Sequence, residues 1–203
     1  MDNIPDIERH PWEPFLPESA RVLFLGSFPP PKKRWSMDFF YPNWINDHWR
    51  IEGQIFFDDR NHFLDMPDRA FRRDLIESFL IEKGIGLYDT ATAVRRLKDN
   101  ASDKFLEVVE PTDIAALVRR APHLRVIVTT GEKATETICE TLHINEMPKV
   151  NQHVEIDLRA ADIPPRETPL CLYRLPSSSR AYPLSFDKKV EAYQTMFRFA
   201  EMI

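Results

Sequence analysis

The sequence predicts an α/β fold, a three-layer α/β/α sandwich with a central, mostly parallel sheet. Short apolar runs such as 21–25 and 125–129 are typical of buried strands, and they alternate with segments of helical periodicity. Several of these runs end in loops rich in functional side chains, as is common at the carboxyl ends of parallel strands. We expect one domain over residues 1–203, in which the proline-containing residues 1–20 form an extended arm.

Each expected element follows from a local pattern. The strand at 154–158 alternates strictly between apolar and polar residues, which favours a half-exposed edge strand. Thr112 is a plausible N-cap, Gly84 ends a helix, and 95–104 is expected to be a polar loop. In chain order we expect strands at 21–25, 85–88, 125–129, 154–158 and 168–174, and helices within 51–63 and at 70–83, 113–120, 132–142 and 186–202.

Three loops that follow predicted strands are rich in functional side chains. The loops are Gly26–Trp49, Asp89–Lys104 and Pro176–Tyr182. Because the carboxyl ends of parallel strands meet at one edge of a sheet, we expect these loops to converge on one site.

Composition narrows the class of protein. The hydrophobic content of 43% and charged content of 29% are ordinary for a globular domain, and a net charge of −5 gives no global signature of nucleic-acid binding. Two cysteines cannot supply a Cys-only zinc site or an iron–sulfur cluster, and the histidines lack metal-binding spacing, so we expect no metal and no cofactor. The acidic N-terminal segment is not a signal peptide, and no apolar run is long enough to span a membrane. We expect a cytoplasmic monomer.

The first loop combines cations with aromatic rings. It carries a basic run, Asn46 and a series of aromatic residues that includes Tyr41. Cations beside flat rings suit a phosphodiester with a base stacked on an aromatic face. The alternative is an aromatic mini-core capped by a solvated basic turn, with Asn46 as an ordinary loop cap. The basic run consists of Lys32, Lys33 and Arg34.

The last loop offers hydroxyl groups and a cation. Small hydroxyl residues with exposed amides suit phosphate contacts, and an arginine can pair with a phosphate. A solvated turn is the alternative. The motif GxSxG is missing, so Ser178 is not expected to be a nucleophile, and the first loop is neither GxGxxG nor a Walker loop. The residues in question are Ser177, Ser178, Ser179 and Arg180.

The order of the motifs resembles the uracil-DNA glycosylase superfamily. GSFPPP follows the first strand, an aromatic segment ends in NDHW, and GLYD, RVIVTTG and RLPSSSRAY come later. The likeness spans roughly residues 20–200 and is closest to the mismatch-specific and hypoxanthine-DNA (deoxyinosine) glycosylase-like branch. Members of that superfamily flip a damaged base out of DNA and hydrolyse its N-glycosidic bond.

The resemblance implies roles for particular residues. The floor of the base pocket would be Gly26, Ser27, Phe28 and Pro29, and Tyr41 would also belong to the pocket. Phe28 stands where many members have a water-positioning Asp or Asn, so Asn46 of the later segment would hold the water, and Phe28 would stack on the base. Asp47 and His48 would assist with water or protons. Leu175 replaces a His of the uracil enzymes, and His48 replaces an aromatic residue of the hypoxanthine branch.

The predicted function is a monofunctional DNA repair glycosylase acting on a damaged or mismatched base, uracil or hypoxanthine. One alternative is a catalytically inactive DNA- or nucleotide-binding protein on the same fold, motivated by Phe28 and Leu175. Another is an α/β enzyme that acts on a free nucleobase or nucleoside, favoured only by the overall acidity.

Overall fold

A computed structural model describes residues 5–98 and 103–203. Its central sheet has the strand order β5-β2-β8-β10-β9. The first four strands run parallel, and β9 pairs with β10 in the antiparallel direction at the edge of the sheet. The prediction of a mostly parallel sheet is confirmed, and the edge strand predicted at 154–158 lies at 152–155. The strands are β2 (Val22–Gly26), β5 (Ile85–Asp89), β8 (Val126–Thr129), β9 (Gln152–Glu155) and β10 (Cys171–Arg174).

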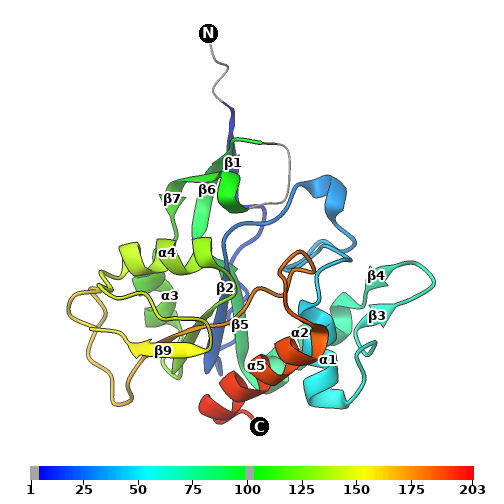
Figure 1. Ribbon diagram of the computed structural model, residues 1–203. Coiled ribbons are helices and arrows are strands. Elements are labelled where there is room, and N and C mark those ends of the chain that lie inside the picture. The colour runs from blue at the N-terminus through cyan, green and yellow to red at the C-terminus, as the bar shows by residue number, and fades with distance from the viewer. Residues whose placement is uncertain (1–4, 99–102) are drawn as a thin grey trace.

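Helices cover the two faces of this sheet. Figure 1 shows α3 and α4 on one side of β2 and β5, and α1, α2 and α5 on the other. Strand β2 is apolar on both faces and buried because each face packs under a helical layer. The helices are α1 (His48–Phe57), α2 (Arg73–Lys83), α3 (Ile114–Arg120), α4 (Glu132–Thr141) and α5 (Phe186–Phe199).

A second, three-stranded antiparallel sheet was not predicted. It has the order β1-β6-β7 and is formed by β1 (Ile7–Arg9), β6 (Ala91–Arg96) and β7 (Leu106–Pro111). The expected polar loop at 95–104 is therefore wrong at its start, and its residues 99–102 lie outside the described residues. The expected extended arm contributes a strand. Strands β6 and β7 share a small apolar cluster around Phe28 that is separate from the main core.

Several element boundaries differ from the predictions for local reasons. Asp113, not Thr112, caps α3, because its carboxylate accepts a hydrogen bond from the amide of Ala116 at 2.8 Å. The hydroxyl of Thr112 instead donates to the carbonyl of Asp89 at 2.7 Å. Helix α2 begins at Arg73 because residues 70 and 71 form β4 (Ala70–Phe71), which pairs with β3 (Leu64–Asp65). As predicted, α2 ends at Gly84, whose φ of 67° is left-handed.

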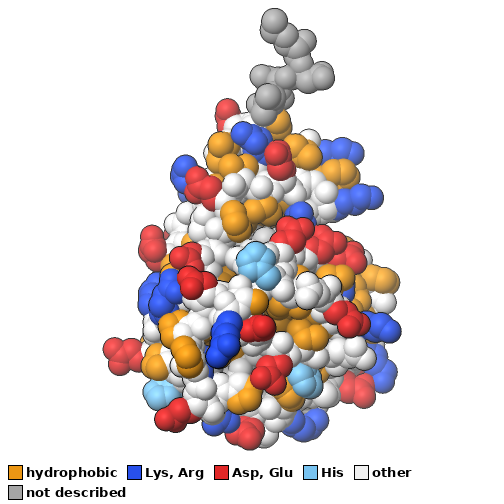
Figure 2. All heavy atoms as spheres, turned by 90° about the vertical axis from the view of Figure 1, so that its left-hand side faces the viewer, with side chains coloured by type: hydrophobic (Ala, Val, Ile, Leu, Met, Phe, Trp, Pro, Cys, Tyr) orange, Lys and Arg blue, Asp and Glu red, His pale blue; other side chains and the backbone are white. Residues whose placement is uncertain are grey.

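The surface on the α3 and α4 side carries interspersed acidic and basic side chains (Figure 2). Such a mixture does not create the strong single-sign field that attracts nucleic acid. In the described part of the chain, no helix is both long enough and apolar enough to cross a bilayer.

Candidate functional site

One cavity of about 1040 Å³ opens at the carboxyl edge of the central sheet. Residues that follow four parallel strands line it: Ser27 after β2, Asp89 at the end of β5, Thr130 after β8 and Ser177 after β10. The predicted convergence of the three strand-end loops is confirmed, since all three contribute to this wall.

The loop after β2 forms one wall of the cavity. Gly26, Ser27, Phe28 and Pro29 all line it. Phe28 packs on the small cluster of β6 and β7, and its ring meets the imidazole of His10 edge to face, with 5.5 Å between ring centroids. The hydroxyl of Ser27 donates to Asp103 at 2.8 Å. Burial raises the pKa of the Asp103 carboxyl, an effect that this hydrogen bond opposes.

Asn46 lies where the first loop meets the serine loop, Ser177–Arg180. Asn46 and Ser179 form an antiparallel β-bridge, and the amide of Asp47 donates to the carbonyl of Ser178 at 3.0 Å. The side-chain oxygen of Asn46 accepts a hydrogen bond from the amide of His48 at 2.9 Å, at the start of α1. Two loops that are more than a hundred residues apart in sequence are thus joined by backbone contacts beside the cavity.

Asp47 points away from the cavity and ties three elements together. Its carboxylate lies 2.8 Å from Nε of Arg180 and 3.8 Å from Nζ of Lys189 in α5. Lys189 also donates to the carbonyl of Ser179 at 2.8 Å. Burial lowers the pKa of Lys189, and the charge of Asp47 opposes that shift. Neither Asp47 nor Arg180 lines the cavity; together they hold the serine loop in place.

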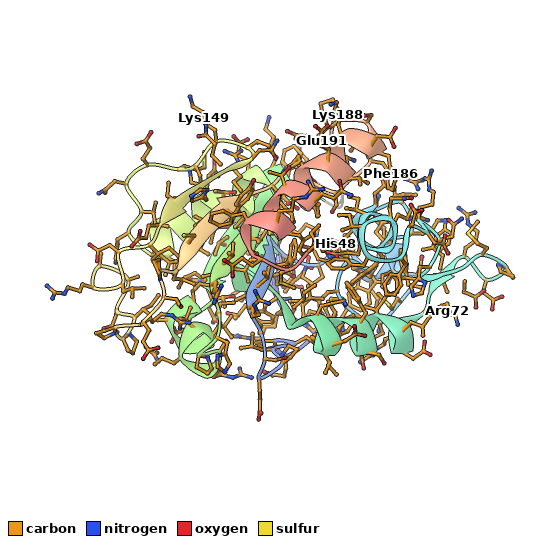
Figure 3. All side chains as sticks on the ribbon, turned by 90° about the horizontal axis from the view of Figure 1, so that it is seen from below. His48, Arg72, Lys149, Phe186, Lys188 and Glu191 are labelled. Carbon is orange, nitrogen blue, oxygen red and sulfur yellow. The ribbon has the colours of Figure 1, made fainter. Side chains whose placement is uncertain are left out.

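His48 is buried behind Tyr41. The two rings stack with 3.7 Å between centroids, and Tyr41 lines the cavity, its hydroxyl 3.2 Å from the hydroxyl of Thr130. Figure 3 shows His48 in the interior, between α1 and α5. Its Nε2 lies 3.6 Å from a carboxyl oxygen of Glu52, which is also buried. Burial lowers the pKa of His48 to about 3 and raises that of Glu52. The structure therefore does not bring His48 to the cavity.

Side chains of the serine loop form hydrogen bonds with the backbone of the same segment. The hydroxyl of Ser177 accepts from the amide of Ser179 at 3.2 Å, and the hydroxyl of Ser179 accepts from the amide of Ala181 at 3.2 Å. The side chain of Ser178 is buried. From below, Tyr193 of α5 reaches the carbonyl of Pro176 with its hydroxyl at 3.5 Å. All three serines line the cavity.

The basic run forms a short 3₁₀ helix, Lys32–Arg34, at the surface. All three side chains are exposed, and Arg34 lines the cavity. Trp35 holds the turn by donating from its ring nitrogen to the carbonyl of Pro30 at 2.7 Å. Two further cations on the cavity wall, Lys104 and Lys133, were not predicted.

Sequence reasoning also missed the contact between His10 and Asp89. His10 follows β1 in the arm, and its Nε2 lies 2.9 Å from Oδ2 of Asp89 at the end of β5. The side chains are 2% and 11% exposed, so this is a buried contact at the cavity. The position of Asp89 at the end of a predicted strand could have marked it as a site residue. Nothing in the sequence indicated that His10 would lie at the site. Nowhere in residues 5–98 and 103–203 do three His, Cys, Asp or Glu side chains gather as a metal site would need.

Comparison with known proteins shows which solved structure has a similar fold. No protein-family model matches the sequence, and no curated protein matches it significantly. Among solved structures, the solution NMR structure of a putative uracil DNA glycosylase from Methanosarcina acetivorans matches 97% of this chain and 99% of its own, with a TM-score of 0.63 and 24% identity. The chain therefore shares the overall α/β fold of that protein.

Proposed function

We propose that the protein is a monofunctional DNA N-glycosylase on a three-layer α/β/α sandwich of the uracil-DNA glycosylase type. The proposal rests mainly on one observation. A single cavity is lined by aromatic rings, by Asn46 and by the serine loop, and a β-bridge links Asn46 to Ser179 of that loop. The likeness in fold to a putative uracil DNA glycosylase supports it. The motif order favours the hypoxanthine-DNA glycosylase-like branch, with deaminated bases as substrates.

The cavity has room and surfaces for a flipped nucleotide. Its volume of about 1040 Å³ is at the upper end of the range for small-molecule sites, about 300–1,000 Å³. Trp12, Phe28 and Phe40 line it with apolar rings on which a base can stack. The serine loop and Arg34 supply hydroxyls, amides and a cation for the flanking phosphates, and Lys32 and Lys33 extend that contact.

In the proposed reaction, Asn46 holds the attacking water. Its side-chain oxygen already accepts from the His48 amide and has a second lone pair for the water. As the glycosidic bond breaks, its electron pair stays on the base nitrogen, and the water oxygen bonds to the anomeric carbon. The backbone amides of Ser27 and Phe28 stabilise the departing base, and the water's proton passes to the base or solvent. Asn46 needs no basicity, because an oxocarbenium-like sugar is attacked by weak nucleophiles.

Asp47 and His48 act in this proposal by positioning. The carboxylate of Asp47 is engaged by Arg180 and Lys189, and the ring of His48 supports Tyr41. Both lie directly after Asn46, so they fix the start of α1 and with it the direction of the Asn46 side chain.

The test is base release from oligonucleotides that carry single uracil, hypoxanthine, xanthine or ethenocytosine lesions, followed by alkaline cleavage. With wild type, the DNA strand should be cleaved at one or more lesions only after treatment with alkali. An enzyme without lyase activity leaves an abasic site, and alkali then cleaves the strand there. Asn46→Ala should lose at least about 100-fold in single-turnover rate, with DNA affinity little changed. Asn61→Ala, an exposed asparagine outside the cavity, is the control and should match wild type.

An inactive DNA-binding protein on the same fold is the second candidate. It is favoured by Phe28, an apolar residue on the cavity wall, and by Leu175, which is fully buried. Salt-dependent DNA binding without release of any base would establish this function and remove the first. Equal excision by Asn46→Ala and wild type would remove Asn46 from the mechanism.

A further inference from the structure

A second cavity, of about 690 Å³, opens at the other end of the central strands. Arg21 and Arg125 line it, and they directly precede β2 and β8, so the cavity lies at the amino edge of the sheet. The length of those strands, roughly 13 to 17 Å at about 3.3 Å per residue, separates it from the carboxyl edge. Among the described residues, none lines both cavities. We call this second hollow the amino-edge cavity.

The amino-edge cavity concentrates positive charge in a chain whose net charge is −5. Of the described residues that line it, Glu167 is the only acidic one, whereas four are arginines. The planar fork of an arginine pairs closely with the oxygens of a phosphate group. A cluster of such cations in a hollow attracts anions even though the chain as a whole is acidic. The four are Arg21, Arg119, Arg125 and Arg166.

Arg166 has no acidic partner within the described residues. Its Nη2 donates to two neutral acceptors, the carbonyls of Pro122 at 2.7 Å and Leu124 at 2.6 Å. Its Nε is buried without an acceptor, while Nη1, which also has none in the described part of the chain, is not buried. Burial lowers the pKa of Arg166. The guanidinium is therefore held in place by the backbone, but its charge is not balanced by a carboxylate.

Arg21 and Arg125 lie side by side on adjacent strands. The amide of Arg125 donates to the carbonyl of Arg21 at 2.8 Å. Nη2 of Arg21 donates to the carbonyls of Ala200 at 3.1 Å and Glu201 at 3.0 Å, just after α5. Nη1 of Arg125 lies 2.5 Å from the carboxylate of Glu201. Each side chain is anchored through one nitrogen, and within the described residues its other nitrogens have no acceptor.

The remaining wall is largely apolar, and the space exceeds what one phosphate group fills. A volume of about 690 Å³ falls within the usual range for small-molecule sites, about 300–1,000 Å³. A ligand that matches both parts of the wall carries a phosphate group and an organic body. The apolar side chains are Val118, Pro122, Ile163, Pro164 and Pro165.

We propose that the amino-edge cavity binds a small phosphate monoester, whose phosphate group pairs with Arg166, Arg21 and Arg125. The organic part of the ester lies against the proline side of the wall. The phosphate dianion supplies the negative charge and the acceptors that Arg166 lacks. This binding is independent of the glycosylase function, because the described residues of the two cavities do not overlap.

The test is isothermal titration calorimetry of the full chain with phenyl phosphate, inorganic phosphate and phenol. Phenyl phosphate should bind once per chain with a Kd of about 1 mM or lower. Inorganic phosphate should bind at least about threefold more weakly, because it buries no apolar surface, and phenol should show no saturable binding.

Arg166→Gln should weaken the binding of phenyl phosphate at least about 10-fold, as expected for loss of charge-assisted hydrogen bonds. Arg159→Gln removes the same charge from an exposed arginine outside both cavities, and its Kd should stay within about twofold of wild type.

A second pair of variants serves if Arg166→Gln does not fold. Thr168 is exposed and lines the amino-edge cavity. Thr168→Asp adds a negative charge there while leaving the arginine anchors in place. It should bind phenyl phosphate at least about fivefold more weakly than Thr168→Asn, which has the same shape without the charge.

Several results would overturn the proposal. These are no saturable binding of phenyl phosphate up to about 10 mM, equal losses in Arg166→Gln and Arg159→Gln, or equal affinities in the two Thr168 variants. A loss found only in Arg34→Gln would place the ligand in the carboxyl-edge cavity instead. Equal affinities for phenyl phosphate and inorganic phosphate would overturn the ester and identify free phosphate as the ligand.

Discussion

At the scale of single residues, the most unusual group is the buried stack of Tyr41, His48 and Glu52. Tyr41 has a left-handed φ of 50°, which is uncommon for an aromatic residue and is held by the ring stack and the contact with Thr130. Behind it, the side chains of His48 and Glu52 have no hydrogen-bond partner at 3.5 Å or less within the described residues. Burial shifts both toward their uncharged forms: it raises the pKa of Glu52 and lowers that of His48 to about 3.

This pair gives stability a specific dependence on pH. The folded pKa of Glu52 is raised above its usual 4.5, so its stabilising contribution is present below pH 4.5 and is lost as pH rises toward the folded pKa. The pKa of His48 is lowered from 6.5 to about 3, so its contribution is present above pH 6.5 and is lost as pH falls through that window. Above pH 4.5 the two slopes have opposite signs, because Glu52 binds more protons in the folded chain and His48 binds more in the unfolded chain.

Glu52→Gln removes the carboxyl while keeping its size. We expect the unfolding free energy of this variant to rise relative to that of wild type as pH increases above 4.5, by up to about 1.4 kcal/mol per pH unit until the folded pKa of Glu52 is reached. Urea denaturation from pH 5 to pH 8.5 measures the difference. Glu155→Gln, an exposed glutamate on β9, is the control and should show a difference that is constant with pH. A constant difference for Glu52→Gln would mean that Glu52 is ionised in the fold.

At the scale of elements, Asp47 joins the start of α1 to the serine loop and to α5. We expect Asp47→Asn to lower the unfolding free energy by about 3 kcal/mol, because it leaves the buried ammonium of Lys189 without its charged partner. Glu191→Gln breaks the Lys188–Glu191 pair, which lies on the outside of the same helix (Figure 3), and should leave the urea midpoint unchanged. Equal effects of the two variants would show that the buried contact gives no stability.

Elements with an intrinsic pattern were predicted from the sequence, and elements that depend on pairing were not. Strand β8 is continuously apolar and α2 ends in a glycine, so their patterns alone locate them. The antiparallel sheet of β1, β6 and β7 depends on contacts between segments far apart in sequence, such as the ion pair of Arg9 with Glu110 at 2.9 Å. Within the described residues, no local pattern distinguishes residues 95–96 from a polar loop.

At the scale of the whole molecule, the position of the site was predictable from the sequence, but the buried contacts around it were not. Strand ends converge by topology, so the walls at Ser27, Asn46 and Ser177 followed from the sequence. The contact of His10 with Asp89 spans 79 residues and carries no spacing signal. The inward direction of His48 was also not predictable. A histidine at the end of the first loop gives the same sequence pattern whether its side chain faces the cavity or the core.

DNA affinity should depend on a local patch, because the chain as a whole has a net charge of −5. Replacing Lys32, Lys33 and Arg34 with alanine should weaken DNA binding and reduce the slope of log K against log salt by roughly 2 to 3, since each phosphate contact contributes about 0.9. Replacing Arg72, Lys149 and Lys188, which are exposed outside the cavity (Figure 3), removes the same charge. Equal slopes for the two triple variants would show that the basic run makes no phosphate contact.

The pairing of β1 with β6 also orders events during synthesis. Residues 7–12 leave the ribosome before their partners at 89–96, which follow after a delay on the order of seconds. Until then the arm has no strand to join, so the aromatic end of the cavity is completed late in folding. An edge strand of three residues is also among the first segments to detach in local unfolding. The same short segment that arrives late would therefore open the aromatic end of the cavity, lined by Trp12 and Phe40, without unfolding the central sheet.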